Sequence, residues 1–214
     1  MHGWGGSADS FLFVAKDLCK NYRVTLVDFY GFGKSPEPVC PMTVPDYAQT
    51  LIELFREQKI EKAIIIAHSF GGRVAINLAS KRADLVEKLV LIDSAGVKPR
   101  RKLSYYIKVL RHKIRRALGL KGLEGSSDYR VLSPVMKETF KLIVNYDQKK
   151  ELKRIVAPTA IFWGEKDKET PLYMARIMNR KIKNSALFVL SGGHFSYIDD
   201  YFRFKKILDA FLDG

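Results

Sequence analysis

The chain has 214 residues, of which 47% are hydrophobic and 28% charged, and its formal net charge is +14. This length and composition allow one sizeable core and exclude an intrinsically disordered chain. No apolar run reaches the roughly 18–20 residues of a membrane span, and the first residues lack the apolar stretch of a signal peptide, so we expect a cytoplasmic location. The two cysteines, Cys19 and Cys40, suggest no disulfide framework and are interpreted as ordinary thiols.

Helical and strand patterns alternate along most of the chain. In chain order they predict a helix at 11–18, a strand at 24–29, a helix at 45–58, a strand at 63–67, a helix at 74–80, strands at 89–92 and 159–163, a helix at 172–178, a strand at 186–190 and a helix at 201–212. The strands from residue 63 onward are continuous apolar runs, typical of strands buried on both faces. The alternation predicts the α/β class, with a mostly parallel, doubly wound sheet covered by helices on both faces.

One stretch interrupts the alternation. Residues 96–156 contain no convincing strand, but apolar residues recur at helical spacing along one face, at Leu103, Tyr106, Ile107, Leu110, Ile114 and Leu118. A second helix is predicted at 134–146. We therefore expect a core made of residues 1–95 and 157–214, with residues 96–156 inserted as a helical cap or lid.

A serine follows the apolar strand predicted at 63–67. The motif Ala67-His68-Ser69-Phe70-Gly71-Gly72 comes directly after this strand and opens the next predicted helix. Such a strand–turn–helix setting is typical of a nucleophile elbow, in which a sharp turn exposes the serine Oγ at the edge of the sheet. Ala67 and Gly71 are small enough to let the turn close, although Gly is usual at the first position. Ser69 is the candidate nucleophile; the alternative is a turn with an idle serine.

A histidine lies where it can reach this serine. His194 follows the strand at 186–190 in a Gly-rich loop, and the carboxyl ends of parallel strands meet at one edge of the sheet. We expect His194 to act as general base. The other three histidines lie in flanking motifs or in a basic segment, at His2, His68 and His112.

Two aspartates compete for the role of orienting His194. Asp167 follows the strand at 159–163, and Asp93 follows the strand at 89–92. A carboxylate there accepts the second imidazole N–H and stabilises the imidazolium. We favour Asp167 and keep Asp93 as the rival.

Backbone N–H groups near Ser69 can stabilise an oxyanion. The first N–H groups of a helix lack partners and carry partial positive charge, which makes the amide of Phe70 a candidate. The turn His2-Gly3-Trp4-Gly5-Gly6 is the candidate source of a second donor, the amide of Trp4.

Five motifs in order give the chain a resemblance to the α/β-hydrolase superfamily, in the branch with a helical lid. They cover nearly the whole chain and begin at His2, Asp28, Ala67, Trp163 and Gly193. The resemblance implies that Ser69, Asp167 and His194 form a triad, that Trp4 and Phe70 form the oxyanion hole, and that no metal or organic cofactor is needed. Ser69 argues against the dehalogenases and epoxide hydrolases of that superfamily, which use an aspartate nucleophile. It leaves esterases, lipases, thioesterases, C–C bond hydrolases, aminopeptidases and cofactor-free peroxidases.

The start of the chain departs from that family. Its members have further strands before the His-Gly turn, and one of them lies between the counterparts of residues 24–29 and 63–67, whereas only Met1 precedes His2 here. Each buried backbone group left unpaired costs roughly 1–3 kcal/mol, against a domain stability of about 5–15 kcal/mol. We therefore hypothesise that Met1 is an internal methionine of a longer protein. Direct pairing of the two neighbouring strands, or a strand from another chain, are the alternatives.

Basic residues are concentrated between residues 98 and 121. No acidic residue interrupts the series Lys98, Arg100, Arg101, Lys102, Lys108, Arg111, Lys113, Arg115, Arg116 and Lys121. We favour a lid with a solvated basic outer face. The alternatives are contact with an anionic membrane surface or with an acidic group of a substrate. A nucleic-acid partner is not expected, because no basic groove with interleaved aromatic residues is evident.

These observations predict a serine hydrolase that cleaves a small to medium carboxylic ester, or a related acyl bond, through an acyl-enzyme. Two alternatives stay open. One is an inactive or truncated binding module with the same fold, and the other is a lipid hydrolase acting at anionic membrane surfaces. The sequence leaves the acyl length and the oligomeric state open.

Overall fold

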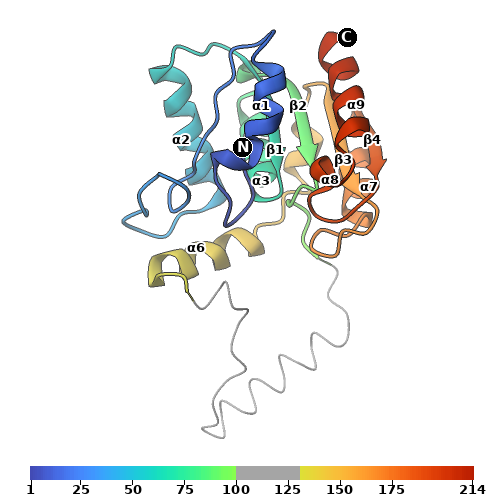
Figure 1. Ribbon diagram of the computed structural model, residues 1–214. Helices are drawn as coiled ribbons and strands as arrows, with labels where there is room; N and C mark the ends of the chain where they lie inside the picture. Colours follow the sequence, from blue (N-terminus) through green and yellow to red (C-terminus); the bar gives the residue numbers. More distant parts are fainter. Residues whose placement is uncertain (100–130) are drawn as a thin grey trace, which may run out of the picture.

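A parallel β-sheet organises the part of the chain that the computed structural model describes, residues 1–99 and 131–214. Its four strands are hydrogen-bonded in the order β1-β2-β3-β4 (Figure 1) and comprise Ala63–His68, Val86–Ile92, Thr159–Gly164 and Ser185–Leu190. All three neighbouring pairs are parallel. The predicted α/β class and the four strands from residue 63 onward are confirmed.

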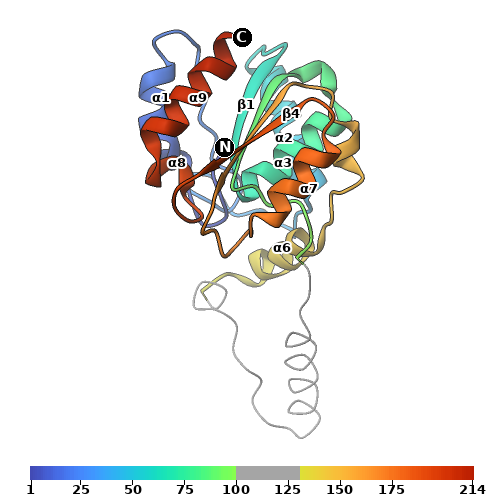
Figure 2. The ribbon, with the colours of Figure 1, turned by 90° about the vertical axis from the view of Figure 1, so that its right-hand side faces the viewer.

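Helices cover both faces of this sheet. Figure 2 shows α1, α8 and α9 on one side of the strands, which are Leu12–Leu18, Ser196–Asp199 and Tyr201–Asp213. The other side carries α2, α3 and α7, which are Val44–Glu57, Phe70–Lys81 and Tyr173–Lys181. The core is correspondingly divided into two apolar clusters, one on each face of the sheet. The predicted helices of the two layers are therefore confirmed. Short 3₁₀ helices lie at Ala8–Phe11, Ala83–Leu85 and Glu151–Arg154.

Local sequence signals explain where these helices begin. Helix α2 starts with a capping box, because the Thr43 side chain accepts from the Asp46 N–H while the Asp46 carboxylate accepts from the Thr43 N–H. Helix α3 instead begins directly at the turn that carries Ser69, with no side-chain cap.

The strand predicted at 24–29 is wrong. Residues 23–29 form no regular secondary structure. A strand needs a neighbour for its backbone groups, and a cavity of about 650 Å³ lies between this segment and β1. Among the described residues, the outer edge of β1 is paired only at its carboxyl end, where the Met1 nitrogen donates to the Ile66 carbonyl and the His68 N–H donates to the Met1 carbonyl.

The prediction that every apolar strand is buried on both faces is also wrong for the two strands at the sheet edges. Ile64 and Ile66 of β1 are only partly buried, and Ala186 of β4 is exposed. The central strand β3 is buried along its whole length. An edge strand has one neighbour fewer, so an apolar sequence alone does not bury it.

The stretch predicted to form a cap, residues 96–156, is described only at 96–99 and 131–156. Residues 100–130, which include the predicted helix at 103–118 and most of the basic series, lie outside the described residues. The helix predicted at 134–146 is confirmed as α6, Pro134–Asn145. It packs against the amino-terminal half of the core, since the Met42 N–H donates to Thr139 Oγ1 over 3.0 Å and the Phe140 ring lies 5.1 Å from the Trp4 ring. Among the helices of residues 1–99 and 131–214, none combines the length and apolar character needed to cross a bilayer.

Helix α9 offers a matched test of the core. Phe204 is fully buried against the Phe162 ring at 4.9 Å, whereas Phe202 on the same helix is 89% exposed. Phe204→Ala should lower the free energy of unfolding by about 3–5 kcal/mol, because it removes apolar contacts and leaves a cavity. Phe202→Ala should change it by less than about 0.5 kcal/mol. Urea unfolding measures both, and equal losses would contradict the assignment of this helix face to the core.

Candidate active site

Ser69 lies at a strained turn between β1 and α3. Its φ of 49° and ψ of −112° are rare for a residue with a side chain, and such strain costs of order 1–3 kcal/mol. Three backbone hydrogen bonds hold the turn: the Ser69 N–H donates to the Ile92 carbonyl over 3.1 Å, and the Ser69 carbonyl accepts from Gly72 and Ala95. This conformation is the one expected of a nucleophile elbow.

The small residues flanking Ser69 are required by close backbone approach. A Cβ at Gly71 would lie 2.7 Å from the His2 carbonyl oxygen and 2.9 Å from that of Met1. The Gly71 N–H donates to the same His2 carbonyl over 3.1 Å. Ala67 is fully buried, so its extra methyl group is accommodated beneath the turn.

The structure brings Ser69, His194 and Asp167 into one hydrogen-bonded line. His194 Nε2 lies 2.9 Å from Ser69 Oγ, and His194 Nδ1 lies 2.9 Å from Asp167 Oδ2. Because a carboxylate only accepts, Nδ1 carries the proton in neutral His194, and Nε2 is left to accept from the serine hydroxyl. These are the three side chains that the sequence assigns to the triad.

The Asp167 carboxylate is held by the loop that follows it. Its Oδ1 accepts from the N–H groups of Glu169 and Thr170, and its Oδ2 lies 2.7 Å from Thr170 Oγ1. Burial raises the pKa of Asp167, but the hydrogen bonds from His194 and Thr170 outweigh it and lower the pKa below its ordinary value. Asp167 therefore stays ionised at neutral pH and faces the imidazole with a fixed geometry.

The rival carboxylate, Asp93, has other partners. Its Oδ1 accepts from the Gly164 N–H over 2.7 Å, and its Oδ2 accepts from the N–H and the hydroxyl of Ser196. Burial raises the pKa of Asp93 to about 6 despite these bonds. Both of its oxygens are thus directed at the ends of β3 and α8 rather than at the imidazole of His194.

A second acidic side chain approaches His194. Glu169 Oε2 lies 3.3 Å from His194 Nε2, on the same side as Ser69 Oγ, and its side chain is 69% exposed. Burial alone lowers the pKa of His194, but the hydrogen bond and charge of Asp167, with the charges of Glu169 and Asp93, raise it above its ordinary value.

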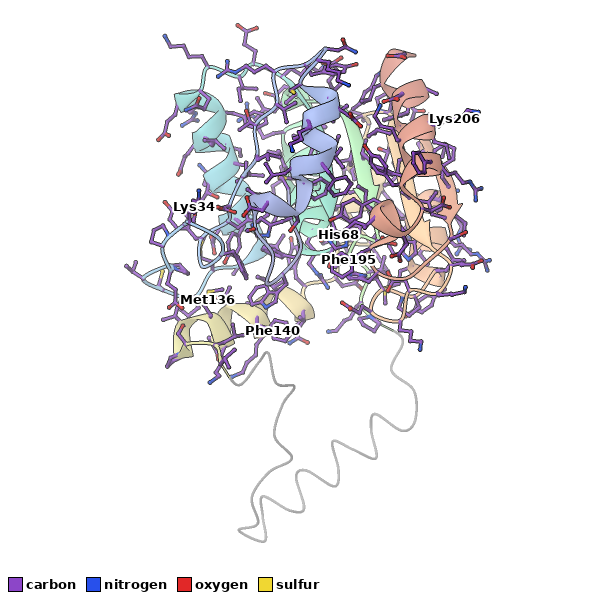
Figure 3. All side chains as sticks on the ribbon, in the orientation of Figure 1. Lys34, His68, Met136, Phe140, Phe195 and Lys206 are labelled. Atoms are coloured by element: carbon purple, nitrogen blue, oxygen red, sulfur yellow. The ribbon has the colours of Figure 1, made fainter. Side chains whose placement is uncertain are left out.

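His68 makes a hydrogen bond to the backbone of the loop that carries His194. Its Nε2 lies 2.7 Å from the His194 carbonyl oxygen, and the two rings are 4.9 Å apart. Burial lowers the pKa of His68 to about 3, so the ring is neutral and donates its Nε2 proton to that carbonyl. His68 and Phe195 lie together at the end of the sheet that faces α6, where Met136 and Phe140 are found (Figure 3).

Two amides beside Ser69 have no hydrogen-bond partner within the described part of the chain, and they are the two named in the sequence analysis. In the first turn of α3 the N–H groups of Gly71 and Gly72 are both used, whereas that of Phe70 has no partner within the described residues. The turn closed by the bond from Gly6 N–H to the Gly3 carbonyl leaves the Trp4 N–H unused as well, again among residues 1–99 and 131–214. The Trp4 and Phe70 rings lie 5.5 Å apart, which brings the two segments together.

The residues around the acid were missed by sequence reasoning. Glu169 and Thr170 follow Asp167 by two and three positions, the spacing at which an aspartate commonly accepts from the backbone of its own turn. That spacing was the available signal. No group of three or more His, Cys, Asp or Glu side chains in the described part of the chain is arranged to hold a metal ion.

Comparisons with known proteins show the family of the chain. A model of the alpha/beta hydrolase family matches residues 1–204. The esterase YbfF of Escherichia coli (strain K12) is 39% identical over 98 residues, 45% of this chain and 38% of that protein. The uncharacterized hydrolase YugF of Bacillus subtilis (strain 168) is 24% identical over 222 residues, 91% of this chain and 81% of that protein. The structure of an esterase from Exiguobacterium antarcticum has a TM-score of 0.80 at 23% identity and covers all of this chain and 90% of its own.

The charges around His194 predict how it titrates. We expect its pKa to lie above the ordinary value and to fall in Asp167→Asn, which removes the principal hydrogen bond and charge. Glu169→Gln should produce a smaller fall. Titration of the imidazole C–H signals by NMR measures the pKa in each variant.

Glu165→Gln is the matched control for that titration. Glu165 is half-exposed and lies 3.5 Å from Lys166 rather than near the imidazole, so its loss should leave the pKa of His194 unchanged. An equal fall in the Glu165 and Glu169 variants would contradict a specific contact between Glu169 and His194.

Proposed function

The chain belongs to the alpha/beta hydrolase family, and we propose on that premise that it is a serine hydrolase that cleaves carboxylic esters through an acyl-enzyme. The observation that carries the proposal is the line of hydrogen bonds from Ser69 Oγ to His194 Nε2 and from His194 Nδ1 to Asp167, each 2.9 Å long. A serine hydroxyl is a weak nucleophile unless a base accepts its proton, and this arrangement provides one.

Acylation begins when Ser69 Oγ attacks the ester carbonyl carbon and His194 Nε2 takes the hydroxyl proton. The negative charge that develops on the carbonyl oxygen is stabilised by the amides of Trp4 and Phe70, the two open N–H groups beside the serine. Asp167 stabilises the imidazolium that forms. His194 then donates the proton to the departing alkoxide, which leaves as an alcohol while the acyl group stays on Ser69.

Deacylation repeats these steps with water. His194 removes a proton from water as its oxygen attacks the acyl carbon, and the proton then returns to Ser69 Oγ as the carboxylic acid leaves. Because the neutral imidazole is the base in both halves, the rate falls as pH drops through the raised pKa of His194.

Two observations support a carboxylic ester with an apolar acyl group. The family relatives include proteins described as esterases, in Escherichia coli and in Exiguobacterium antarcticum. The Trp4 ring beside the open amides contacts the rings of Phe32 and Phe140 at 4.8 and 5.1 Å, which supports an apolar wall for an acyl chain.

A fluorophosphonate probe tests the nucleophile directly. The Ser69 oxygen should displace fluoride from the probe and add one phosphonyl group to the intact mass. Ser69→Ala should lose the adduct and lower kcat/KM for a short p-nitrophenyl ester by at least about 10⁴-fold.

Ser80→Ala is the matched control for the nucleophile. Ser80 lies in the last turn of α3, at the opposite end of the helix from Ser69. Its hydroxyl donates to the Asn77 carbonyl. Its loss should leave labelling and hydrolysis unchanged. An adduct that persists in Ser69→Ala, or an unlabelled native protein, would refute the proposed function.

A further inference from the structure

Glu169 contacts the nitrogen of His194 that faces the serine. Its Oε2 lies 3.3 Å from His194 Nε2, and the same nitrogen lies 2.9 Å from Ser69 Oγ. Asp167 instead contacts Nδ1, on the other side of the ring. Two carboxylates therefore flank one imidazole, with Asp167 at the nitrogen that is held and Glu169 at the nitrogen that the proposed reaction uses.

The turn that holds Asp167 also fixes the backbone of Glu169. The Glu169 N–H donates to Asp167 Oδ1 over 2.8 Å, and the N–H of the next residue, Thr170, donates to the same oxygen over 3.0 Å. The Thr170 carbonyl in turn accepts from the indole N–H of Trp163, a buried residue of β3. The Glu169 carboxylate is thus carried by a backbone that is anchored to the acid and to the sheet.

The Glu169 carboxylate is accessible to a substrate. Its side chain is 69% exposed, and no Lys or Arg of residues 1–99 and 131–214 forms an ion pair with it. By contrast, Asp147 and Glu165 each lie beside a lysine, at 3.2 and 3.5 Å. A cation that enters the site can therefore approach Glu169 without displacing a basic side chain of the described part of the chain.

The proposed reaction brings the alcohol part of the ester to this carboxylate. His194 Nε2 takes the proton from Ser69 Oγ and gives it to the departing oxygen, so that oxygen has to come within hydrogen-bond distance of Nε2. A carboxylate 3.3 Å from Nε2 is then a direct neighbour of the alcohol part. The carbonyl oxygen is directed away from it, toward the amides of Trp4 and Phe70.

We propose that Glu169 selects the alcohol part of the substrate and favours esters whose alcohol carries a positive charge close to the ester oxygen. This inference rests on the proposed ester hydrolysis and adds a substrate class to it. A cation there is attracted by the carboxylate, whereas an anionic alcohol is repelled. Because the Glu169 side chain is mostly in water, the effect is modest and weakens with added salt.

Three butanoate esters test the proposal, because they share the acyl group and differ in the charge of the alcohol. The 2-(trimethylammonio)ethyl ester carries a cation, the 3,3-dimethylbutyl ester is its neutral isostere, and the 3-sulfopropyl ester carries an anion. The native chain should hydrolyse the cationic ester with a kcat/KM about three- to fivefold above that of the neutral isostere. The anionic ester should have the lowest kcat/KM, and the differences should shrink in roughly 0.5 M NaCl.

Substitutions at Glu169 should change the preference in a defined order. Glu169→Gln should bring the ratio of kcat/KM for the cationic and neutral esters to about one, and Glu169→Lys should make the anionic ester the better substrate. Comparing esters within one variant cancels any change in the pKa of His194, because that change affects all three alike. Glu165→Gln is the matched control on the same loop, and it should keep the native ratio.

The outcomes separate this inference from the proposed function. Equal ratios in the native chain, Glu169→Gln and Glu169→Lys would overturn the inference, and so would a native preference for the anionic ester. In either case, hydrolysis of the neutral ester would leave the proposed function standing. If the native chain hydrolysed none of the three esters, the proposed ester hydrolysis would be refuted and this inference with it.

Discussion

The carboxylate of Asp93 ties together the chain segments on which the candidate site depends. It accepts from Gly164 at the end of β3 and from both donors of Ser196 at the start of α8. Ser196 lies two residues after His194. Ile92, the residue before Asp93, accepts from the Ser69 N–H. One buried anion thus fixes the ends of β2 and β3 and the loop that carries the imidazole. Removing such a group would leave three buried donors unpaired, at roughly 1–3 kcal/mol each.

This network separates two roles that the sequence leaves in competition. Asp93 and Asp167 both follow parallel strands, so the rule that strand ends meet at one edge places both near His194. Their neighbours distinguish them. Asp93 is surrounded by N–H and hydroxyl donors that occupy both of its oxygens, whereas Asp167 keeps Oδ2 directed at His194 Nδ1. Strand order alone does not reveal this, because it depends on where the loops after β3 and β4 return.

Sequence patterns predict an element well when the element satisfies its own hydrogen bonds or pairs with at least one neighbouring strand. The helices and the strands β1 to β4 are of this kind, and so is the turn at Ser69, whose small flanking residues mark it. The segment at 24–29 has equally strong strand propensity and forms no strand, because propensity does not supply a partner. Glu169 and Thr170 were missed for a related reason, since their contacts with the acid and the imidazole depend on how a loop closes.

The outer edge of β1 and the candidate site share one segment of backbone. Met1 ends the pairing along β1, and the next three residues lead directly to the open amide of Trp4. The His2 carbonyl accepts from the Gly71 N–H, and His2 Nε2 accepts from the Phe29 N–H over 3.2 Å. This segment therefore also links the turn at Ser69 to Phe29. At Met1 itself, a single bridge to β1 fixes the segment. The position of the Trp4 amide, which the proposed function uses as an oxyanion donor, is therefore set by the sheet edge as much as by the residues around Ser69.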